Sequence, residues 1–277
     1  MKKTVLITGT SSGLGKTAAK YFAKHGWNVV ATMRAPEQEK DLAGLGDVLV
    51  TRLDVVDRES IQLAIEAGIA RFGKIDALIN NAGFGLYGVF EGISREKVQQ
   101  QFDVNVFGVM DVTRAILPHF RENKGGLIIN VSSGAGVFTL PMLSLYCASK
   151  FALEGFSESL SYELASQNIV VKIVEPGGVL STNFGKRSGA EAAQNSALAD
   201  YNEFITGANA IFAGLRESRR ATEEDVAAVI FTAATDGTKQ LRYVATEDIL
   251  PLVRARRESS EEQYIEFMRS RYQPKKS

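Results

Sequence analysis

Close to its amino end the chain reads Val5-Leu6-Ile7-Thr8-Gly9-Thr10-Ser11-Ser12-Gly13-Leu14-Gly15. The first three residues predict a buried strand, the glycines predict a tight turn, and the apolar spacing over residues 14–22 predicts a helix. Glycines let backbone N–H groups approach a pyrophosphate closely, and the N-terminus of a helix adds partial positive charge. A glycine turn can also merely join a strand to a helix, but its place at the start of an alternating chain favours nucleotide binding.

The glycine spacing excludes one nucleotide-binding motif. The turn has the form Gly-x-x-x-Gly-x-Gly rather than the Gly-x-Gly-x-x-Gly of the usual dinucleotide fingerprint. The residues Gly15-Lys16-Thr17 look like the end of a P-loop, but a P-loop needs a glycine at the position of Thr10. Lys16 is therefore interpreted as an ordinary residue of the first helical turn.

Short apolar runs and helical patterns alternate along the rest of the chain. The runs cover residues 5–7, 28–32, 48–53, 75–79, 127–131 and 169–174, with 241–245 as a further candidate. The helical patterns cover residues 14–22, 61–72, 98–117, 146–164 and 226–234, and Pro118 closes the third. Strands that are apolar on both faces, alternating with helices, indicate an α/β fold with a doubly wound parallel sheet covered on both sides.

The composition is that of an ordinary globular protein. The 277 residues are 45% hydrophobic and 23% charged, and 32 basic residues balance 32 acidic ones. This balance gives no sign of a nucleic-acid groove or an acidic tail, so we expect no nucleic-acid partner. The single cysteine, Cys147, excludes an internal disulfide, and with only two histidines it leaves almost no ligands for zinc or iron. We therefore expect no metal site.

The connections between the patterns are short and show no linker, so we expect a single domain over residues 1–277. The segment 178–220 interrupts the alternation of apolar runs and helical patterns, and its own helical pattern is weak. Such a segment is typical of a substrate-binding lid or of a merely irregular loop. The charged tail over about 247–277 is expected to form surface helices, and its apolar stripe to pack on the core or on a partner. No run approaches the roughly 20 apolar residues of a membrane span, so we expect a cytoplasmic protein without membrane contact.

Tyr146 and Lys150 are the strongest candidates for acid–base chemistry. Four residues apart on a predicted helix, they share one face and can point into one cleft. A tyrosine pKa of about 10 is too high for a base near neutrality, and a nearby ammonium group would lower it. Ser133 follows the fifth apolar run, where open parallel sheets bind ligands, and its hydroxyl can hold a substrate oxygen. Taken alone, Tyr146 and Lys150 are more typical of a surface tyrosine and a solvated lysine, and Ser133 is also typical of a serine bonded to local backbone.

Further motifs follow in order along the chain. They are Asn80-Asn81-Ala82-Gly83, Asn105, Ser133, Tyr146-x-x-x-Lys150 and Pro176-Gly177. Asn105 lies inside a helical pattern, where an asparagine needs either a structural hydrogen bond or a functional role. Together with the glycine turn, this ordered set over residues 8–177 resembles the classical branch of the short-chain dehydrogenase/reductase family.

The resemblance implies a Rossmann-type sheet of seven parallel strands in the order 3-2-1-4-5-6-7, with helices on both faces. It also implies a catalytic tetrad of Asn105, Ser133, Tyr146 and Lys150, in which Asn105 relays a proton through water to Lys150. Ser133 stands thirteen positions before Tyr146, as in the family pattern, which leaves the neighbouring Ser132 as the weaker candidate.

The end of the second apolar run predicts which nicotinamide cofactor binds. NAD-dependent Rossmann enzymes carry an acidic residue there, whereas this chain has Met33 followed by Arg34. A guanidinium group can stack on adenine and pair with a 2′-phosphate, so we expect NADP(H) to be preferred over NAD(H). The alternative is that Arg34 faces solvent in a loop.

By resemblance, the cofactor lies along the carboxyl ends of the strands. Asp54 would contact the adenine amino group, although alone it could be a helix cap, and either Ser181 or Thr182 would touch the carboxamide. The cofactor-binding residues so implied are Gly9, Ser11, Ser12, Gly13, Leu14, Gly15, Arg34, Asp54, Val55, Asn81, Ala82, Gly83, Tyr146, Lys150, Pro176, Gly177 and Val179.

The residues expected around the substrate are mostly apolar, without a charged cluster that would bind a carboxylate or phosphate. They are Phe84, Leu86, Tyr87, Phe138, Leu140, Met142, Leu143 and Phe184. We therefore expect a small apolar ketone, aldehyde or secondary alcohol, in keeping with a likeness to the branch that holds steroid and retinol dehydrogenases. The alternative is a catalytically silent NADP(H)-sensing regulatory protein of the same fold. Because family members are often dimers or tetramers, the resemblance also suggests a homodimer or homotetramer.

Overall fold

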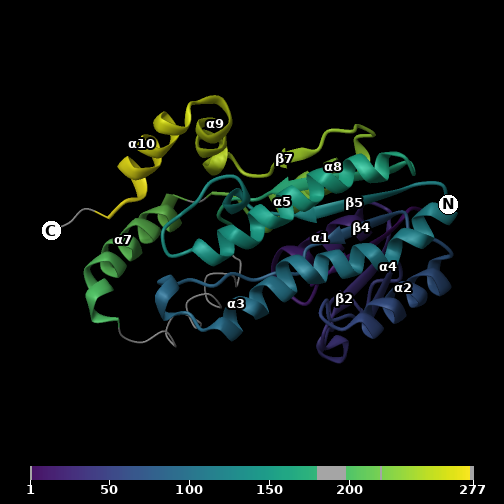
Figure 1. Cartoon of the computed structure of the whole chain (residues 1–277). Coiled ribbons are helices and arrows are strands. Elements are labelled where there is room, and N and C mark those ends of the chain that lie inside the picture. Colours follow the sequence, from purple (N-terminus) through teal and green to yellow (C-terminus); the bar gives the residue numbers. More distant parts are fainter. Residues whose placement is uncertain (1, 180–197, 219, 275–277) are drawn as a thin grey trace.

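Seven parallel strands form one sheet in the computed structural model, which describes residues 2–179, 198–218 and 220–274. Their order is β3-β2-β1-β4-β5-β6-β7, which confirms the predicted topology (Figure 1). Because every neighbouring pair is parallel, all strands end at the same edge of the sheet. The strands are β1 (Thr4–Thr8), β2 (Asn28–Met33), β3 (Val48–Arg52), β4 (Ala77–Asn80), β5 (Gly126–Val131), β6 (Ile169–Glu175) and β7 (Arg242–Val244).

Helices cover both faces of this sheet. Helices α1 and α8 pack on one face, and α2, α4 and α5 pack on the other. The helices are α1 (Gly13–Lys24), α2 (Arg58–Phe72), α3 (Arg95–Phe102), α4 (Gly108–Glu122), α5 (Ser144–Ala165), α7 (Asn202–Ser218), α8 (Glu223–Thr235), α9 (Leu250–Glu258) and α10 (Glu261–Tyr272).

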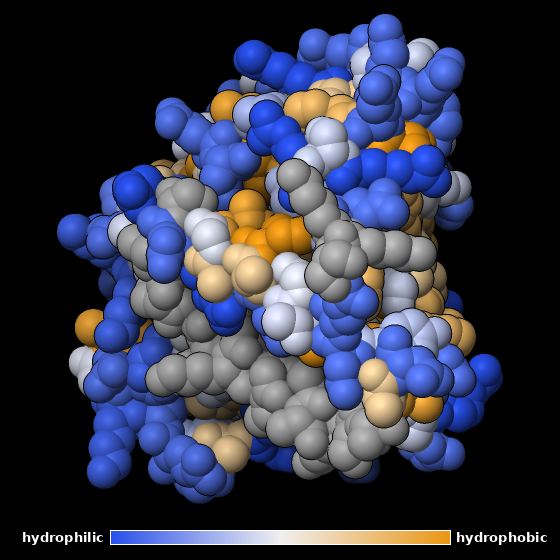
Figure 2. Space-filling model, turned by 90° about the vertical axis from the view of Figure 1, so that its left-hand side faces the viewer, coloured by the Kyte–Doolittle hydropathy of each residue, from blue (hydrophilic) through white to orange (hydrophobic). Residues whose placement is uncertain are grey.

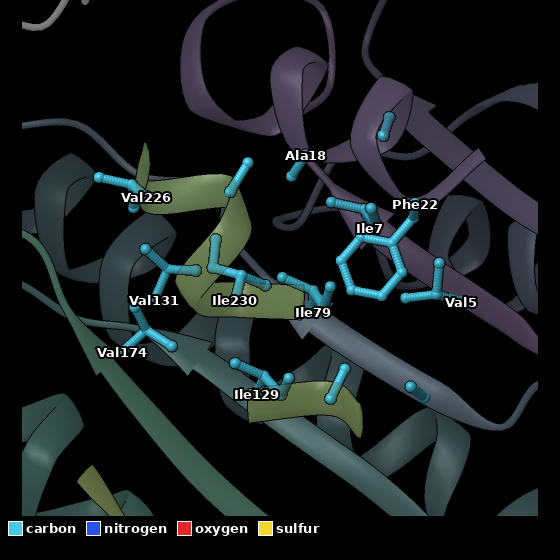
Figure 3. Close-up of a cluster of buried hydrophobic side chains, with 14 of the residues drawn as sticks. Val5, Ile7, Ala18, Phe22, Ile79, Ile129, Val131, Val174, Val226 and Ile230 are labelled. Atoms are coloured by element: carbon cyan, nitrogen blue, oxygen red, sulfur yellow. The ribbon is translucent and has the colours of Figure 1, made fainter. Parts of the chain in front are cut away.

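Successive side chains of a strand point to opposite faces of the sheet, and here both faces are apolar. Val5 and Ile7 of β1 join the cluster under α1 and α8, whereas Leu6 between them joins the cluster under α2, α4 and α5. Figure 3 shows the first cluster, in which Phe22 of α1 and Ile230 of α8 lie over the side chains of neighbouring strands. Burial on both faces explains why the strands read as continuous apolar runs in the sequence.

The helical pattern over 98–117 is interrupted, and it continues further than the sequence predicts. Helix α3 passes through a π-helical turn, Asp103–Phe107, into α4, and α4 continues past Pro118. The prediction that Pro118 ends the helix is wrong because this residue lies on the exposed face, where the carbonyl group of Arg114 that loses its partner can bind water. The π-helical turn contains Asn105, and such turns occur frequently at functional sites.

Helix α7 lies in a segment for which the sequence predicts irregular structure. Its residues Ile211 and Leu215, one turn apart, pack against the apolar cluster that contains Tyr264 and Met268 of α10. Figure 1 shows α7 and α10 next to each other at one end of the molecule. The apolar stripe of the tail therefore packs on the rest of the chain, as one of the two sequence interpretations requires.

Other local predictions have mixed outcomes. The candidate seventh strand is confirmed as β7, and the third strand ends at Arg52, so Asp54 lies in the loop after it. Ser181, Thr182 and Phe184 lie outside the described residues. Among the helices that the structure describes, none is long and apolar enough to cross a membrane.

Candidate active site

The glycine turn between β1 and α1 is shaped to receive an anion. Gly9 and Gly13 have positive φ angles of 74° and 58°, which glycine adopts at little cost. A methyl group built on Gly15 would overlap the carbonyl oxygen of Gly9, so this position has no room for a side chain. Within the described residues, Ser12 at the N-cap makes no side-chain bond to the helix, and the first turn holds no acidic residue. The backbone N–H groups at this helix end are therefore free to bind a phosphate group.

Hydrogen bonds from the end of β4 fix the turn in place. The Thr8 hydroxyl accepts from the backbone N–H groups of Asn81 and Ala82, at 3.0 Å each. The Asn81 side-chain amide donates to the carbonyl oxygens of Thr8 (2.9 Å) and Gly9 (3.2 Å). Asn81 thus ties the ends of two strands together, and Ala82 and Gly83 line the cavity beside it.

Arg34 lies at the end of β2, at the edge of the same cavity. Its side chain is exposed, whereas Met33 before it is buried, and no carboxylate of the described residues lies within ion-pair distance of it. The guanidinium group is therefore free to bind a ligand. Asp54 also lines this region and is not the helix cap, because Asp57 caps α2 by accepting from the backbone N–H of Ser60.

Tyr146, Ser133 and Lys150 meet on one side of the cavity. Tyr146 and Lys150 lie one turn apart on α5, and both side chains are buried. The Tyr146 hydroxyl is hydrogen-bonded to the Ser133 side chain. The Lys150 ammonium group donates to the carbonyl oxygen of Val131 at 2.9 Å and lies 5.9 Å from the centre of the Tyr146 ring. The arrangement therefore combines a pair of hydroxyl groups with one cation.

Burial dominates the electrostatics of these side chains. It raises the pKa of Tyr146 to about 12, against the opposing effect of the hydrogen bond from Ser133. Burial also lowers the pKa of Lys150 to about 8, and the carboxylate of Glu154 opposes that change. The predicted lowering of the Tyr146 pKa is therefore wrong for this geometry, because burial raises the pKa more than the hydrogen bond from Ser133 lowers it.

Of the two serines after β5, Ser133 is the one bonded to the tyrosine. Its hydroxyl also accepts from the backbone N–H of Ala135 at 3.1 Å, so a local turn fixes its position. Ser132 is buried, and its hydroxyl has no partner among the described residues. Ser133 is therefore the serine that can hold a substrate oxygen beside Tyr146.

Asn105 ties the π-helical turn to its surroundings. Its amide oxygen accepts from the backbone N–H of Phe84 (3.0 Å), and its amide nitrogen donates to the Phe84 carbonyl oxygen (2.8 Å) and to the Ser149 hydroxyl (3.1 Å). These are the structural hydrogen bonds that one interpretation of the sequence requires. A methyl group built on Gly83 would lie 3.1 Å from Asn105 Oδ1 and 3.8 Å from Lys150 Nζ, so Gly83 keeps a gap open between the two side chains.

The loop after β6 is held by two residues that sequence reasoning missed. The N–H of Gly177 donates to the Thr246 hydroxyl (2.9 Å), and the N–H of Gly178 donates to the Asp248 carboxylate (3.1 Å). A methyl group on Gly177 would overlap both of these side chains, so the position requires glycine. Thr246 and Asp248 follow β7, and the rule that parallel strands end at one edge of the sheet could have placed them here.

A single cavity of about 1180 Å³ extends from the glycine turn to helices α7, α9 and α10. Because it exceeds the roughly 300–1,000 Å³ of a typical small-molecule pocket, it has room for a dinucleotide and a substrate together. Apart from Ser181 and Thr182, which lie outside the described residues, the residues that the sequence predicts to bind the cofactor line this cavity. Of the predicted tetrad, Ser133, Tyr146 and Lys150 line it as well, whereas Asn105 lies behind the wall.

Beyond Tyr146 the cavity wall is largely apolar. The predicted residues that line it are Phe84, Tyr87, Phe138, Leu140, Met142 and Leu143. The prediction for Leu86 is wrong, because Leu86 is packed in a buried cluster with Ile93 and Leu145. Sequence reasoning missed Leu198, Ile205, Phe212, Leu215, Leu252 and Tyr272. Figure 2 shows the side of the molecule that lies on the left in Figure 1, with apolar side chains near its centre and polar ones around them.

Two charged residues also line the substrate end, namely Arg216 of α7 and Arg271 of α10. These two charged residues are not among those that the sequence predicts around the substrate. Arg216 lies in the segment 178–220, which the sequence predicts to be a substrate-binding lid or an irregular loop, and Arg271 lies in the tail, which the sequence does not place at the substrate.

Comparison with known sequences identifies the family. The family model for short chain dehydrogenases matches residues 3–193. An uncharacterised oxidoreductase of Schizosaccharomyces pombe is 39% identical over 213 residues, which cover 76% of this chain and 87% of that protein. Human retinol dehydrogenase 8 is 40% identical over 193 residues, which cover 66% of this chain and 61% of that protein.

Solved structures agree with this result. A short-chain dehydrogenase from Streptomyces avermitilis has a TM-score of 0.82 at 31% identity and covers 98% of this chain and 97% of its own. One from Burkholderia phymatum in complex with NAD has a TM-score of 0.78 at 26% identity, with coverage of 100% and 97%. ElxO with NADP bound has a TM-score of 0.72 at 27% identity, with coverage of 88% and 98%. The chain therefore belongs to the short-chain dehydrogenase/reductase family, and it is an NAD(P)-dependent dehydrogenase.

Proposed function

We propose that this protein is an NADP(H)-dependent oxidoreductase that interconverts an apolar ketone or aldehyde with the corresponding alcohol, with Tyr146 as its acid–base residue. The observation that carries the proposal is the buried Tyr146 phenol, hydrogen-bonded to Ser133, between a glycine-lined and an apolar part of one cavity. A hydroxyl group in this position can exchange a proton with a substrate oxygen.

Each residue of the proposed tetrad has a distinct task. Ser133 holds the carbonyl oxygen, and Tyr146 donates a proton to that oxygen during reduction, or removes it from the alcohol during oxidation. The nicotinamide, when bound, supplies or accepts the hydride at the substrate carbon. Lys150 holds the nicotinamide ribose and places positive charge near the phenol while it gives up its proton.

We propose that the gap beside Gly83 holds a water molecule between Asn105 and Lys150. The gap has polar atoms of both side chains on its two sides, and Lys150 is buried, so it needs a route by which its proton returns. Asn105 Oδ1 already accepts from Phe84, but a carbonyl oxygen has a second lone pair for this water. Asn105 is thus a positioning residue for the relay that the family resemblance implies.

The free guanidinium group of Arg34 supports the preference for NADP(H). It is exposed beside the buried Met33, where NAD-dependent Rossmann enzymes carry an acidic residue. A 2′-phosphate offers it charge-assisted hydrogen bonds that a 2′-hydroxyl does not. The glycine turn fits the pyrophosphate of either cofactor, so Arg34 is the residue that discriminates between them.

The test is NADPH oxidation by the purified protein against aliphatic and aromatic aldehydes, ketones, steroids and retinal. We expect turnover of at least one apolar carbonyl compound, alcohol formation detected by mass spectrometry, and loss of both in Tyr146→Phe. NADPH binding with no turnover of any panel member would favour the alternative, a regulatory NADP(H) sensor. The single domain, the homo-oligomeric state and the cytoplasmic location stay predictions of the sequence.

A further inference from the structure

The substrate end of the cavity holds two positive charges that the proposed mechanism does not use. Arg216 and Arg271 line it, and neither has a carboxylate within ion-pair distance in the described part of the chain. We propose that the substrate is amphipathic, with its carbonyl group on an apolar body and an anionic oxygen group, a carboxylate or a phosphate, that binds these two arginines. This inference rests on the proposed function and names the substrate class for the same site.

Helix α7 connects Arg216 with the reacting end of the cavity. Phe212 packs against the cluster around Tyr146, and Arg216 follows it by four residues on the same helix face, about 6 Å along the axis. The Phe212 ring also packs edge-on against the Tyr87 ring at 5.3 Å. Burial raises the pKa of Tyr87, and the charge of Arg216 opposes that change, so Arg216 lies near this ring. Arg216 therefore lies one helical turn along α7 from the apolar wall that Phe212 forms.

Helix α10 brings the second charge to the same end. Leu215 and Tyr272 belong to one apolar cluster, so the adjacent residues Arg216 and Arg271 extend from helices that pack together. Figure 1 shows these helices next to each other. The Arg271 guanidinium lies over the Phe267 ring at 4.5 Å, a contact that restricts its position.

One carboxylate also lines the substrate end of the cavity. Asp248 is the acidic residue among the described residues that line the substrate end, and it accepts from the Gly178 N–H and from the Thr246 hydroxyl beside the loop after β6. It repels an anion while the arginines attract one. The charges of Asp248 and Arg271 both act on Tyr272 of α10, so Asp248 opposes part of the attraction that the two arginines exert on an anion.

Calorimetric titration at saturating NADP+ tests the anion site with three ligands of equal chain length: decanoate, decyl phosphate and neutral decanamide. We expect at least one anion to bind the wild-type protein about three- to tenfold more tightly than decanamide, the modest gain of exposed charge pairs. The double variant Arg216→Gln/Arg271→Gln is expected to bind all three alike. The control Arg269→Gln lies on α10 but outside the cavity lining, and it is expected to keep the preference. The tighter anion identifies which oxygen group the site takes.

Equal wild-type affinity for anionic and neutral ligands, or an anion preference that survives in the double variant, would overturn the inference. Turnover is measured separately, with an ω-oxo fatty acid and its methyl ester as matched substrates for NADPH oxidation. A preference for the acid in kcat/KM that falls with salt would support the inference further. No turnover of either substrate, with the anion preference intact in titration, would count against the proposed function and leave the anion site standing.

Discussion

The cofactor end of the cavity is built mainly from backbone, whereas the substrate end is built mainly from side chains. At the cofactor end, Gly9 and Gly15 lie in a turn that has no room for side chains at these positions and that the Asn81 amide holds together. At the substrate end, Phe212 of α7 and Tyr272 of α10 form the wall together with residues of the sheet loops. The first end is formed by short segments at the carboxyl ends of the strands, whereas the second also requires helices α7 and α10.

This difference indicates which end of the cavity is common to the class of enzyme and which end distinguishes one member of the class from another. A glycine turn binds a pyrophosphate by its backbone, so it tolerates few changes and serves every member of the class. Side chains on the covering helices can change without disturbing the sheet. The substrate end can therefore vary while the chemistry at Tyr146 stays the same.

Replacing Gly15 by alanine is expected to damage the cofactor end most severely. The added methyl group would overlap the Gly9 carbonyl oxygen, and the turn must distort to accommodate it. We expect the Kd for NADPH to rise about 5- to 100-fold, which corresponds to about 1–3 kcal/mol of overpacking. Titration with NADPH measures it, and Gly155→Ala, where an added methyl meets nothing within 4 Å, is the matched control. Unchanged NADPH affinity in Gly15→Ala would show that the turn is not the cofactor site.

The rate of carbonyl reduction is expected to fall as the pH rises above about 8, the pKa to which burial lowers Lys150. Below this pH the ammonium group stabilises the negative charge that develops on Tyr146, and above it the lysine is neutral. Tyr146 itself, with a pKa of about 12, stays protonated through this range. We expect kcat/KM to fall about tenfold per pH unit above that value.

The matching measurement is a pH profile of kcat/KM, with the Kd for NADPH measured at each pH. Lys150→Arg, if active, is expected to move the fall to higher pH because a guanidinium group keeps its proton. A profile that stays flat across the titration of Lys150 would contradict this role of its charge.

Replacing Arg34 by glutamine is expected to change cofactor choice without changing the cofactor end as a whole. Because Arg34 is exposed, we expect only about a three- to tenfold rise in the Kd for NADPH, and no change for NADH. Arg121→Gln, on α4 and outside the cavity lining, is the control. Equal effects of Arg34→Gln on the two cofactors would remove the basis for the NADP(H) preference.

Replacing Phe212 by alanine is expected to affect the substrate end alone. The half-buried ring contributes apolar surface to the wall, so we expect about a threefold to tenfold rise in KM for an apolar carbonyl substrate. The Kd for NADPH is expected to stay unchanged. Phe204→Ala lies on the same helix outside the cavity lining and is the control. A parallel loss of NADPH affinity in Phe212→Ala would mean that the two ends are not independent.

The same difference explains what the sequence could predict. The cofactor end was predictable because Gly9, Asn81 and Tyr146 stand in short motifs at positions that strand and helix patterns fix. The substrate end was not, because Phe212 lies in a segment whose composition hides its helix, and its contacts depend on how α7 packs against the tail. The raised pKa of Tyr146 and the π-helical turn at Asn105 depend on burial and packing, which a sequence pattern does not contain.

The central claim is that Tyr146 is the acid–base residue of an NADPH-dependent carbonyl reduction. Single-turnover measurement of NADPH oxidation tests it, with wild type and Tyr146→Phe each loaded with NADPH and mixed with a saturating carbonyl substrate. The account predicts a rate about 10²–10⁴-fold lower in the variant, because general acid catalysis is lost while the ring and the cofactor site remain. Equal rates in the two proteins, with equal Kd for NADPH, would contradict it.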